Sequence, residues 1–270
     1  MPNDSEPTLE VWRDRDGRVT AYAHTARGSH WVRLPGVAVF GYDPEQDEVT
    51  AVVDSGMSRP EVAEAYRRVV LPMIQQARRS QVLHASGVRA ATGVVAFCGT
   101  SGTGKSTVAY GLARRGYPLW ADDAVCFATS ERGMESIPLP FDLLLRAPTA
   151  SFFDSASDSV TVIPQTKGDA TEAVRLEAVC VLRADDSTSA TGSPVRILAL
   201  ASGEAFTATL QHAYTLALSD TDHRTRLVDD YLELVATTPV YDVSFERGLE
   251  HLDVVLDAIE QRLGLEPPPE

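Results

Sequence analysis

Short apolar runs separated by turn residues make up the first fifty residues of the chain. The runs lie at residues 19–24, 30–34, 37–42 and 49–53. Glycine-containing pairs such as Pro35-Gly36 separate them, which is typical of strands joined by tight turns. The pattern predicts a small antiparallel β-meander with Trp12, Trp31 and Phe40 in its core. Residues 1–8 are polar and are expected to be disordered.

A helical spacing of apolar residues begins near Ser58. Ser58 can serve as an N-cap, Pro60 follows in the first turn and Glu61 adds an acidic group, as helix starts often do. The helix is expected to run to about Arg79. Its apolar stripe consists of Val62, Tyr66, Val69, Val70 and Ile74. Together with the meander it forms a predicted N-terminal subdomain of residues 1–80.

Strands and helices alternate from residue 81 onward. Strands are predicted at residues 94–98, 176–182, 195–200 and 239–245. Helices are predicted at residues 107–115, 202–218, 221–234 and 246–263. The strands at 176–182 and 195–200 are expected to pair as a hairpin whose tip covers residues 185–193. Residues 151–173, rich in Ser, Asp and Thr, are either a mobile loop near an acceptor site or an irregular surface segment.

A glycine-rich motif stands between the strand at 94–98 and the helix that follows it. It matches the pattern G-x-x-x-x-G-K-[ST], in which backbone N–H groups and the helix N-terminus bind phosphate. Nucleotide binding is expected from Gly99, Thr100, Ser101, Gly102, Thr103, Gly104, Lys105, Ser106 and Thr107. In this motif the lysine reaches the β- and γ-phosphates and the serine hydroxyl binds Mg²⁺. The sequence therefore predicts ATP and Mg²⁺ as cofactors.

Two further segments flank this P-loop, Leu83-His84-Ala85-Ser86 before it and Ala121-Asp122-Asp123 after it. In this order the three segments resemble the HPr kinase/phosphorylase family of the phosphoenolpyruvate carboxykinase superfamily. The region after them is similar to small HPr-kinase-like proteins, including lasso-peptide precursor kinases. The resemblance implies a P-loop kinase-type α/β fold with a mixed sheet flanked by helices, beside the small β-rich N-terminal subdomain. The catalytic domain would cover residues 81–265, followed by a disordered tail at 266–270.

The resemblance also implies roles for particular residues. It makes Asp122 the catalytic base and leaves Asp123 to assist Mg²⁺ or the loop, although the two roles could be exchanged. Adjacent residues of a strand point to opposite faces, so the two carboxylates are not expected to share one task. His84 is expected to face the active site, with a structural histidine as the alternative, and Ser86 to support it.

Arg146 closes an apolar stretch and is a candidate clamp on phosphate or on a substrate carboxylate. A surface guanidinium is the equal alternative. The three histidines on predicted helices receive no role: His212, His223 and His251.

The composition of the chain limits the kinds of partner that are expected. The chain of 270 residues carries 24 basic and 38 acidic residues, a net charge of −14, which argues against a nucleic-acid partner. Its cysteines, Cys98, Cys126 and Cys180, lie in apolar runs without metal-ligand spacing, as expected of a cytoplasmic protein. No run is long enough to span a membrane, so no membrane partner is expected.

Two functions remain open at this level. The first is an ATP-dependent kinase whose acceptor is a hydroxyl, either the serine of a peptide or small protein or a group on a small metabolite. The second is a nucleotide-binding regulatory or scaffold subunit of a peptide-modifying complex. The first 80 residues do not match the N-terminal domain of HPr kinases, so the acceptor is not inferred to be HPr. Homo-oligomerisation also stays open.

Overall fold

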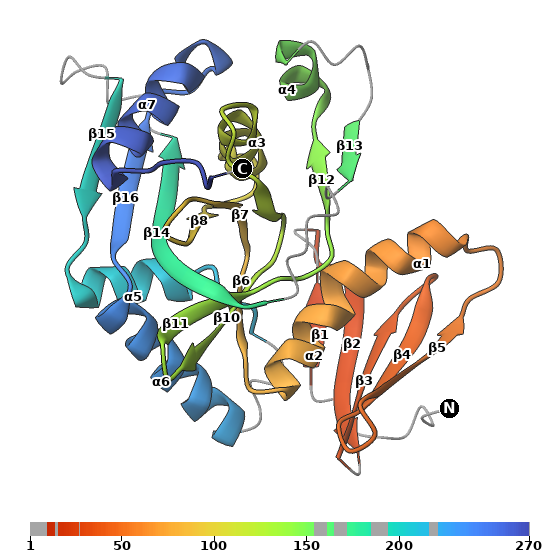
Figure 1. Ribbon diagram of the computed structural model, residues 1–270. Helices are drawn as coiled ribbons and strands as arrows, with labels where there is room; N and C mark the ends of the chain where they lie inside the picture. Colours follow the sequence, from red (N-terminus) through yellow and green to blue (C-terminus); the bar gives the residue numbers. More distant parts are fainter. Residues whose placement is uncertain are drawn as a thin grey trace. The chain divides into compact units, whose positions relative to one another are not determined.

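The computed structural model describes residues 10–13, 16–26, 28–153, 161–164, 172–184, 194–215 and 221–269 (Figure 1). The chain divides into two compact units. The first comprises residues 1–81 and 214–229, and the second comprises residues 82–213 and 230–270. Residues 1–8 and the predicted hairpin tip at 185–193 lie outside the described residues.

The first unit is built on a five-stranded antiparallel sheet whose strands follow chain order. They are β1 (Glu10–Arg13), β2 (Val19–Ala26), β3 (Ser29–Leu34), β4 (Ala38–Asp43) and β5 (Glu48–Val53). Each pairs with the next along the chain, so the predicted meander is confirmed. Alternating side chains of β3 and β4, among them Val32 and Phe40, are buried on one face.

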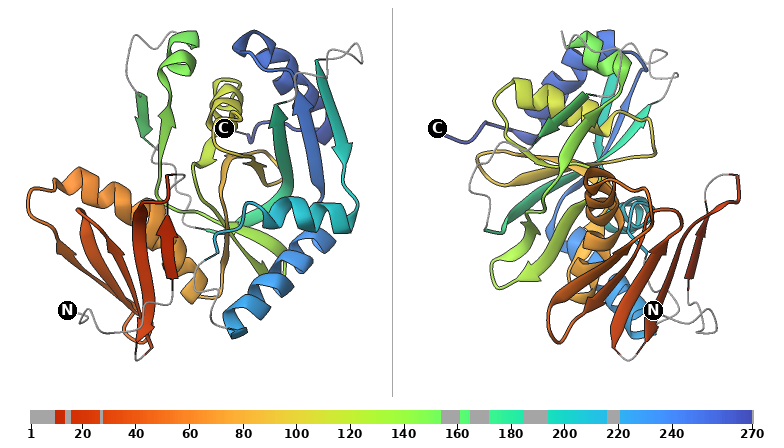
Figure 2. Two further views of the ribbon diagram at one scale, coloured as in Figure 1. Left: turned by 180° about the vertical axis from the view of Figure 1, so that it is seen from behind. Right: turned by 90° about the vertical axis from the view of Figure 1, so that its right-hand side faces the viewer.

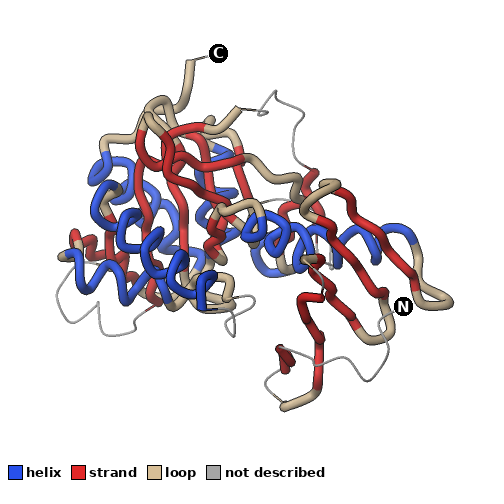
Figure 3. The backbone as a smooth tube through the Cα atoms, turned by 90° about the horizontal axis from the view of Figure 1, so that it is seen from below, coloured by secondary structure: helices blue, strands red, loops and turns tan. Residues whose placement is uncertain are grey.

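A helical segment covers that face (Figure 3). It consists of α1 (Arg59–Ala65), a π-helical turn (Tyr66–Val70) and α2 (Leu71–Ala77). At its start the backbone N–H of Ser58 donates to the Glu61 carboxylate at 2.9 Å, which satisfies one N–H group at the helix start. Val70 and Ile74 of the predicted apolar stripe pack on the sheet, together with Met73.

The second unit contains a nine-stranded mixed sheet. Its strands are β6 (Gln81–Leu83), β7 (Ala85–Arg89), β8 (Val94–Cys98), β9 (Leu119–Ala121), β10 (Val125–Ser130), β11 (Gly133–Ile137), β14 (Val174–Ala184), β15 (Val195–Ala199) and β16 (Val240–Phe245). β14 is parallel to both β8 and β16, and β7 is antiparallel to β8. The predicted α/β class with a mixed sheet is confirmed.

Helices cover both faces of this sheet. On one face α3 (Lys105–Arg114) and α7 (Leu252–Leu263) share a core with β8 and β14. The two helices approach closely, because a Cβ on Gly111 would lie 2.8 Å from Leu256 Cδ1. On the other face Tyr231 of α6 (Thr221–Thr237) packs edge-on against Phe127 of β10 and donates its hydroxyl to Val82 O. The sheet is therefore held between two helical layers.

Smaller elements complete the second unit. The hairpin of β12 (Asp142–Leu145) and β13 (Thr161–Pro164) accompanies the short helix α4 (Ala147–Phe152). β13 falls within the loop predicted at 151–173, of which residues 154–160 and 165–171 lie outside the described part. The expected disordered tail begins with an ordered residue, because Glu266 O accepts the Ala91 N–H at 2.8 Å.

Two predictions about this unit were wrong. β14 and β15 do not pair as a hairpin, because β16 lies between them and pairs with both (Figure 2). The buried Val240 and Val243 explain why β16 occupies an interior position. The helix predicted over 202–218 ends earlier, as α5 (Ser202–Leu210). The chain then turns so that Ala213 bridges to Leu83 and the carbonyl of His212 accepts the His84 N–H at 2.7 Å.

Candidate active site

Strand directions bring the three motif segments to one edge of the sheet. The P-loop leaves the carboxyl end of β8. β7 runs in the opposite direction, so its first residue, Ala85, lies opposite Cys98 at the end of β8. β9 is antiparallel to β7 in turn, and Ala121 lies opposite Gly87. His84, the P-loop and Asp122 therefore meet at the same edge, although Asp122 follows His84 by 38 positions in the sequence.

The P-loop has the backbone of an anion-binding loop. Gly102 and Gly104 have φ values of 86° and 107°, a region that L side chains rarely adopt. The loop is closed by Thr103, whose hydroxyl donates to Thr100 O at 2.8 Å. Lys105 opens α3 directly after the loop, so the N-terminal N–H groups of that helix face the same place.

Lys105 is buried, with 8% of its surface exposed. Its Nζ donates to the carbonyl of Gly99 at 2.9 Å, which holds the ammonium group beside the loop. Burial lowers its pKa, and the charge of Arg146 lowers it further, while Asp123 and Asp122 raise it. A cation that has lost much of its hydration in this way gains more from an arriving anion than an exposed lysine does.

Asp122 connects all three motif segments. Its Oδ1 accepts a hydrogen bond from Ser106 Oγ at 2.8 Å and another from Ser86 Oγ at 2.6 Å. Ser106 belongs to α3 and Ser86 to β7. Asp122 is only 6% exposed, so its carboxylate does not lie in a solvated turn. The side chain predicted to act in catalysis thus directly contacts the side chain predicted to bind the metal.

Asp123 differs from Asp122 in backbone and exposure. β9 ends at Ala121, so both carboxylates lie beyond the strand and the expected alternation of strand faces does not apply to them. Asp123 has a left-handed backbone with φ of 63°, and its side chain is half-buried. The carbonyl of Asp123 contacts His84 Nδ1 at 3.1 Å.

His84 is held on two sides. Its backbone N–H donates to His212 O, and its Nδ1 donates to Asp123 O, because a carbonyl oxygen can only accept. The proton therefore sits on Nδ1, and Nε2 is the acceptor nitrogen of the neutral ring. Burial lowers the pKa of His84, and the nearby charge of Lys105 lowers it further, so the neutral form prevails at pH 7.

His212 joins this cluster, although its sequence position gave it no role. Burial is the main cause that lowers the pKa of His212, and the charges of Lys105, His84 and Arg183 lower it further. It lies there because α5 ends at Leu210 and the chain turns back to β6. The helical spacing of apolar residues continued to Leu218 and therefore concealed this turn.

Arg146 lies beside the P-loop. A Cβ placed on Gly102 would be 3.8 Å from one of its terminal nitrogens, and its side chain is exposed. The guanidinium is thus close to the loop and accessible to a ligand. His251, in contrast, lies 3.9 Å from the carboxylates of Glu246 and Glu250.

The residues present fit the two predicted cofactors. The loop and Lys105 could hold phosphate, and Ser106 and Asp122 could supply two oxygen ligands of the hard type that Mg²⁺ prefers. Mg²⁺ usually keeps several waters and needs few protein ligands. The described residues contain no cluster of three or more His, Cys, Asp or Glu suited to a metal.

Comparison with known proteins finds similarity to solved structures but none in sequence. No family model matches the chain, and no curated protein matches it in sequence. The solved structure of the HPr(Ser) kinase/phosphatase from Coxiella burnetii is similar over 68% of this chain and 97% of that one, with 14% identity and a TM-score of 0.38. A similarity of this size assigns no role to any residue. Within the described part of the chain, no helix is both long and apolar enough to cross a membrane.

Proposed function

We propose that the chain is an ATP- and Mg²⁺-dependent kinase that transfers the γ-phosphate to a hydroxyl acceptor. The acceptor would be a serine of a peptide or small protein, or a small metabolite. The observation that carries the proposal is the hydrogen bond from Ser106 to Asp122 at the start of the P-loop helix. A buried carboxylate bound to this particular serine is the arrangement that holds Mg²⁺ in P-loop enzymes.

The loop residues would bind and orient the phosphates. The N–H groups of the loop and of the first turn of α3 donate to phosphate oxygens, and Lys105 places its charge beside them. Phosphoryl transfer needs mainly positioning and neutralisation of charge. Arg146, exposed beside Gly102, would add a second cation at the outer side of the transferred group.

Ser106 and Asp122 would hold the metal. When bound, Mg²⁺ supplies positive charge that stabilises the phosphates in the transition state. Ser86 keeps Asp122 oriented through the hydrogen bond at 2.6 Å. This assignment places Asp122 on the metal side, and so favours the exchanged form of the two carboxylate roles that the family resemblance left open.

Asp123 would then act on the acceptor. Its half-buried carboxylate can accept the hydroxyl proton or orient the hydroxyl toward the phosphate. His84 would position it, because the hydrogen bond from Nδ1 to Asp123 O supports the left-handed backbone at that residue. The acceptor nitrogen Nε2 of His84 is a second group able to receive the proton.

A transfer assay tests this proposal. Purified protein, Mg²⁺ and γ-labelled ATP are incubated with separate peptide and metabolite fractions, beside the Asp123→Asn variant. Label in one fraction, formed only by the wild type, is the expected result and identifies the acceptor class. ATP binding without label in any fraction would instead support a nucleotide-binding regulatory or scaffold subunit. The proposal places the protein in the cytoplasm and allows for a homo-oligomer.

A further inference from the structure

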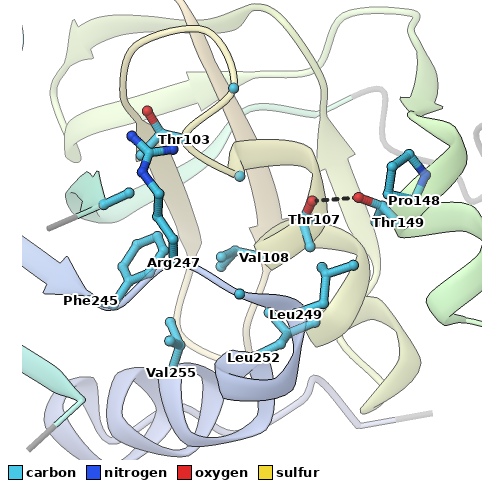
Figure 4. Close-up of a pocket in the computed structure, with 14 residues that line it drawn as sticks. Thr103, Thr107, Val108, Pro148, Thr149, Phe245, Arg247, Leu249, Leu252 and Val255 are labelled. Atoms are coloured by element: carbon cyan, nitrogen blue, oxygen red, sulfur yellow. Dashed lines mark hydrogen bonds between the residues drawn. The ribbon is translucent and has the colours of Figure 1, made fainter. Parts of the chain in front are cut away.

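A pocket of about 240 Å³ opens beside the P-loop, on the side of α7 (Figure 4). One wall is the loop itself, from Gly102 to Gly104, continued by the first turn of α3. The opposite wall is formed by Phe245 at the end of β16 and by residues 247–249 after it, and α4 closes the rim with Pro148 and Thr149. The pocket therefore adjoins the phosphate site and is formed by segments of the second unit alone.

The floor of this pocket is apolar. Val108, Leu252 and Val255 line it and are almost completely buried. Phe245 and Leu249, both half-buried, add an aromatic ring and a branched side chain to its wall. A flat aromatic group could cover this surface and remove it from water.

Polar groups stand at the end of the pocket nearest the loop. The hydroxyls of Thr107 and Thr149 lie 3.3 Å apart across the gap between α3 and α4. Arg247 extends its side chain from the end of β16 toward Thr103 of the loop (Figure 4). Hydroxyl groups and a guanidinium at this position suit a sugar and the phosphate attached to it.

We propose that this pocket binds the nucleoside part of ATP, with the base on the apolar floor and the ribose beside Thr107, Thr149 and Arg247. The inference rests on the proposed function. The volume of the pocket is below the roughly 300–1,000 Å³ of pockets that enclose whole ligands. This is expected if the phosphates lie outside the pocket, in the loop. His84, Asp122 and Asp123 are not among its lining residues, so it lies on the donor side of the reaction, away from the acceptor.

The lining also predicts weak selection among bases. The described residues around the pocket include no Asn, Asp, Gln or Glu, the side chains that most readily distinguish adenine from guanine by hydrogen bonds. Strong discrimination requires polar groups that are left unpaired by the wrong ligand. ATP and GTP are therefore expected to bind within about tenfold of each other.

Calorimetric titration with ATP and with inorganic tripolyphosphate tests the pocket. Tripolyphosphate keeps the three phosphates and lacks the nucleoside. The wild type is expected to bind ATP at least about tenfold more tightly than tripolyphosphate. Leu249→Trp, which fills the pocket, and Thr149→Val, which removes one hydroxyl with little change of shape, should each weaken ATP binding several-fold and leave tripolyphosphate binding within about twofold.

Arg247→Ala should weaken the binding of ATP more than the binding of tripolyphosphate. Arg114→Ala is the control, because this variant removes the same charge from an exposed site at the other end of α3. Equal affinity of the wild type for both ligands, or an equal loss for both in the pocket variants, would overturn the nucleoside site and leave the phosphate site intact. Failure of the wild type to bind either ligand would overturn the proposed kinase as well. A GTP affinity more than about a hundredfold below that of ATP would contradict the expected weak selection.

Discussion

Ser106 donates its hydroxyl hydrogen to the same oxygen of Asp122 that accepts from Ser86. Ser106 lies in the first turn of the helix after the P-loop, whereas Ser86 belongs to the neighbouring strand β7. One buried carboxylate oxygen therefore joins the predicted metal ligand to the sheet. This relationship links the H-A-S, P-loop and A-D-D segments in one hydrogen-bonded unit.

The first prediction concerns Ser86. Ser86→Ala removes the hydrogen bond from Ser86 to Asp122 Oδ1 and leaves the one from Ser106, and the loop, in place. Loss of a group that orients a metal ligand typically costs 10- to 100-fold in metal affinity or activity. We expect about a tenfold rise in the Mg²⁺ concentration needed for half-maximal transfer, with little change in the affinity for metal-free ATP. An unchanged Mg²⁺ requirement would show that Ser86 does not act through Asp122.

The second prediction concerns the pH dependence of stability. Burial and the charge of Lys105 lower the pKa of His84, while Asp123 and Asp122 act in the opposite direction. The folded state therefore prefers neutral His84, and its contribution to stability is complete above the unfolded pKa of about 6.5. It is lost as the pH falls from there through the lowered pKa of the folded state.

Urea unfolding near neutral pH and near pH 5 measures this effect. His84→Gln should lose less free energy of unfolding over this interval than the wild type does. His251→Gln is the control, since His251 lies in the turn before α7, half-buried and near Glu246 and Glu250. Identical pH dependence of His84→Gln and the wild type would contradict the prediction.

The third prediction concerns Arg115, which joins α3 to α7. Its guanidinium donates to Asp257 at 2.7 Å and to Asp253 at 3.0 Å, and it also pairs with Glu260. The side chains of Arg115 and Glu260 are 25% and 24% exposed, so their ion pair is only partly screened by solvent, whereas Asp253 and Asp257 are largely exposed. Arg115→Ala should lower the free energy of unfolding by about 2 kcal/mol.

The neighbouring exposed residue gives a matched comparison. Arg114→Ala removes the same side chain one position earlier and should change stability by less than about 0.5 kcal/mol. Chemical denaturation of both variants is the measurement. Equal effects of the two substitutions would show that the Arg115 cluster adds nothing to the packing of the P-loop helix.

Local patterns predicted much of the fold. Alternating apolar residues and turn pairs are short-range signals, and they identified the meander formed by β1 to β5. The P-loop was equally recognisable, because its glycines are required by the backbone within one short segment. Both features depend on residues that are neighbours in the sequence, so one amino-acid sequence was sufficient to predict them.

The errors concern contacts between distant segments. The position of β16 between β14 and β15 depends on which apolar strand is buried deepest, and the apolar pattern of each strand is the same in either arrangement. The end of α5 depends on the bridge between Ala213 and Leu83. His212 and Arg247 reach the P-loop region only through such contacts, so no local signal could have assigned them there.

Binding of Mn²⁺ to the ATP complex, followed by electron paramagnetic resonance, tests most directly the claim that Ser106 and Asp122 hold the metal. Asp122→Asn keeps the size of the side chain and removes its charge, Asp123→Asn does the same one residue later, and Asp229→Asn is an exposed control on α6. We predict that Asp122→Asn weakens Mn²⁺ binding at least about tenfold, with Asp123→Asn and the control within about twofold of the wild type. Normal Mn²⁺ affinity in Asp122→Asn together with a loss in Asp123→Asn would contradict the claim and return the role of base to Asp122.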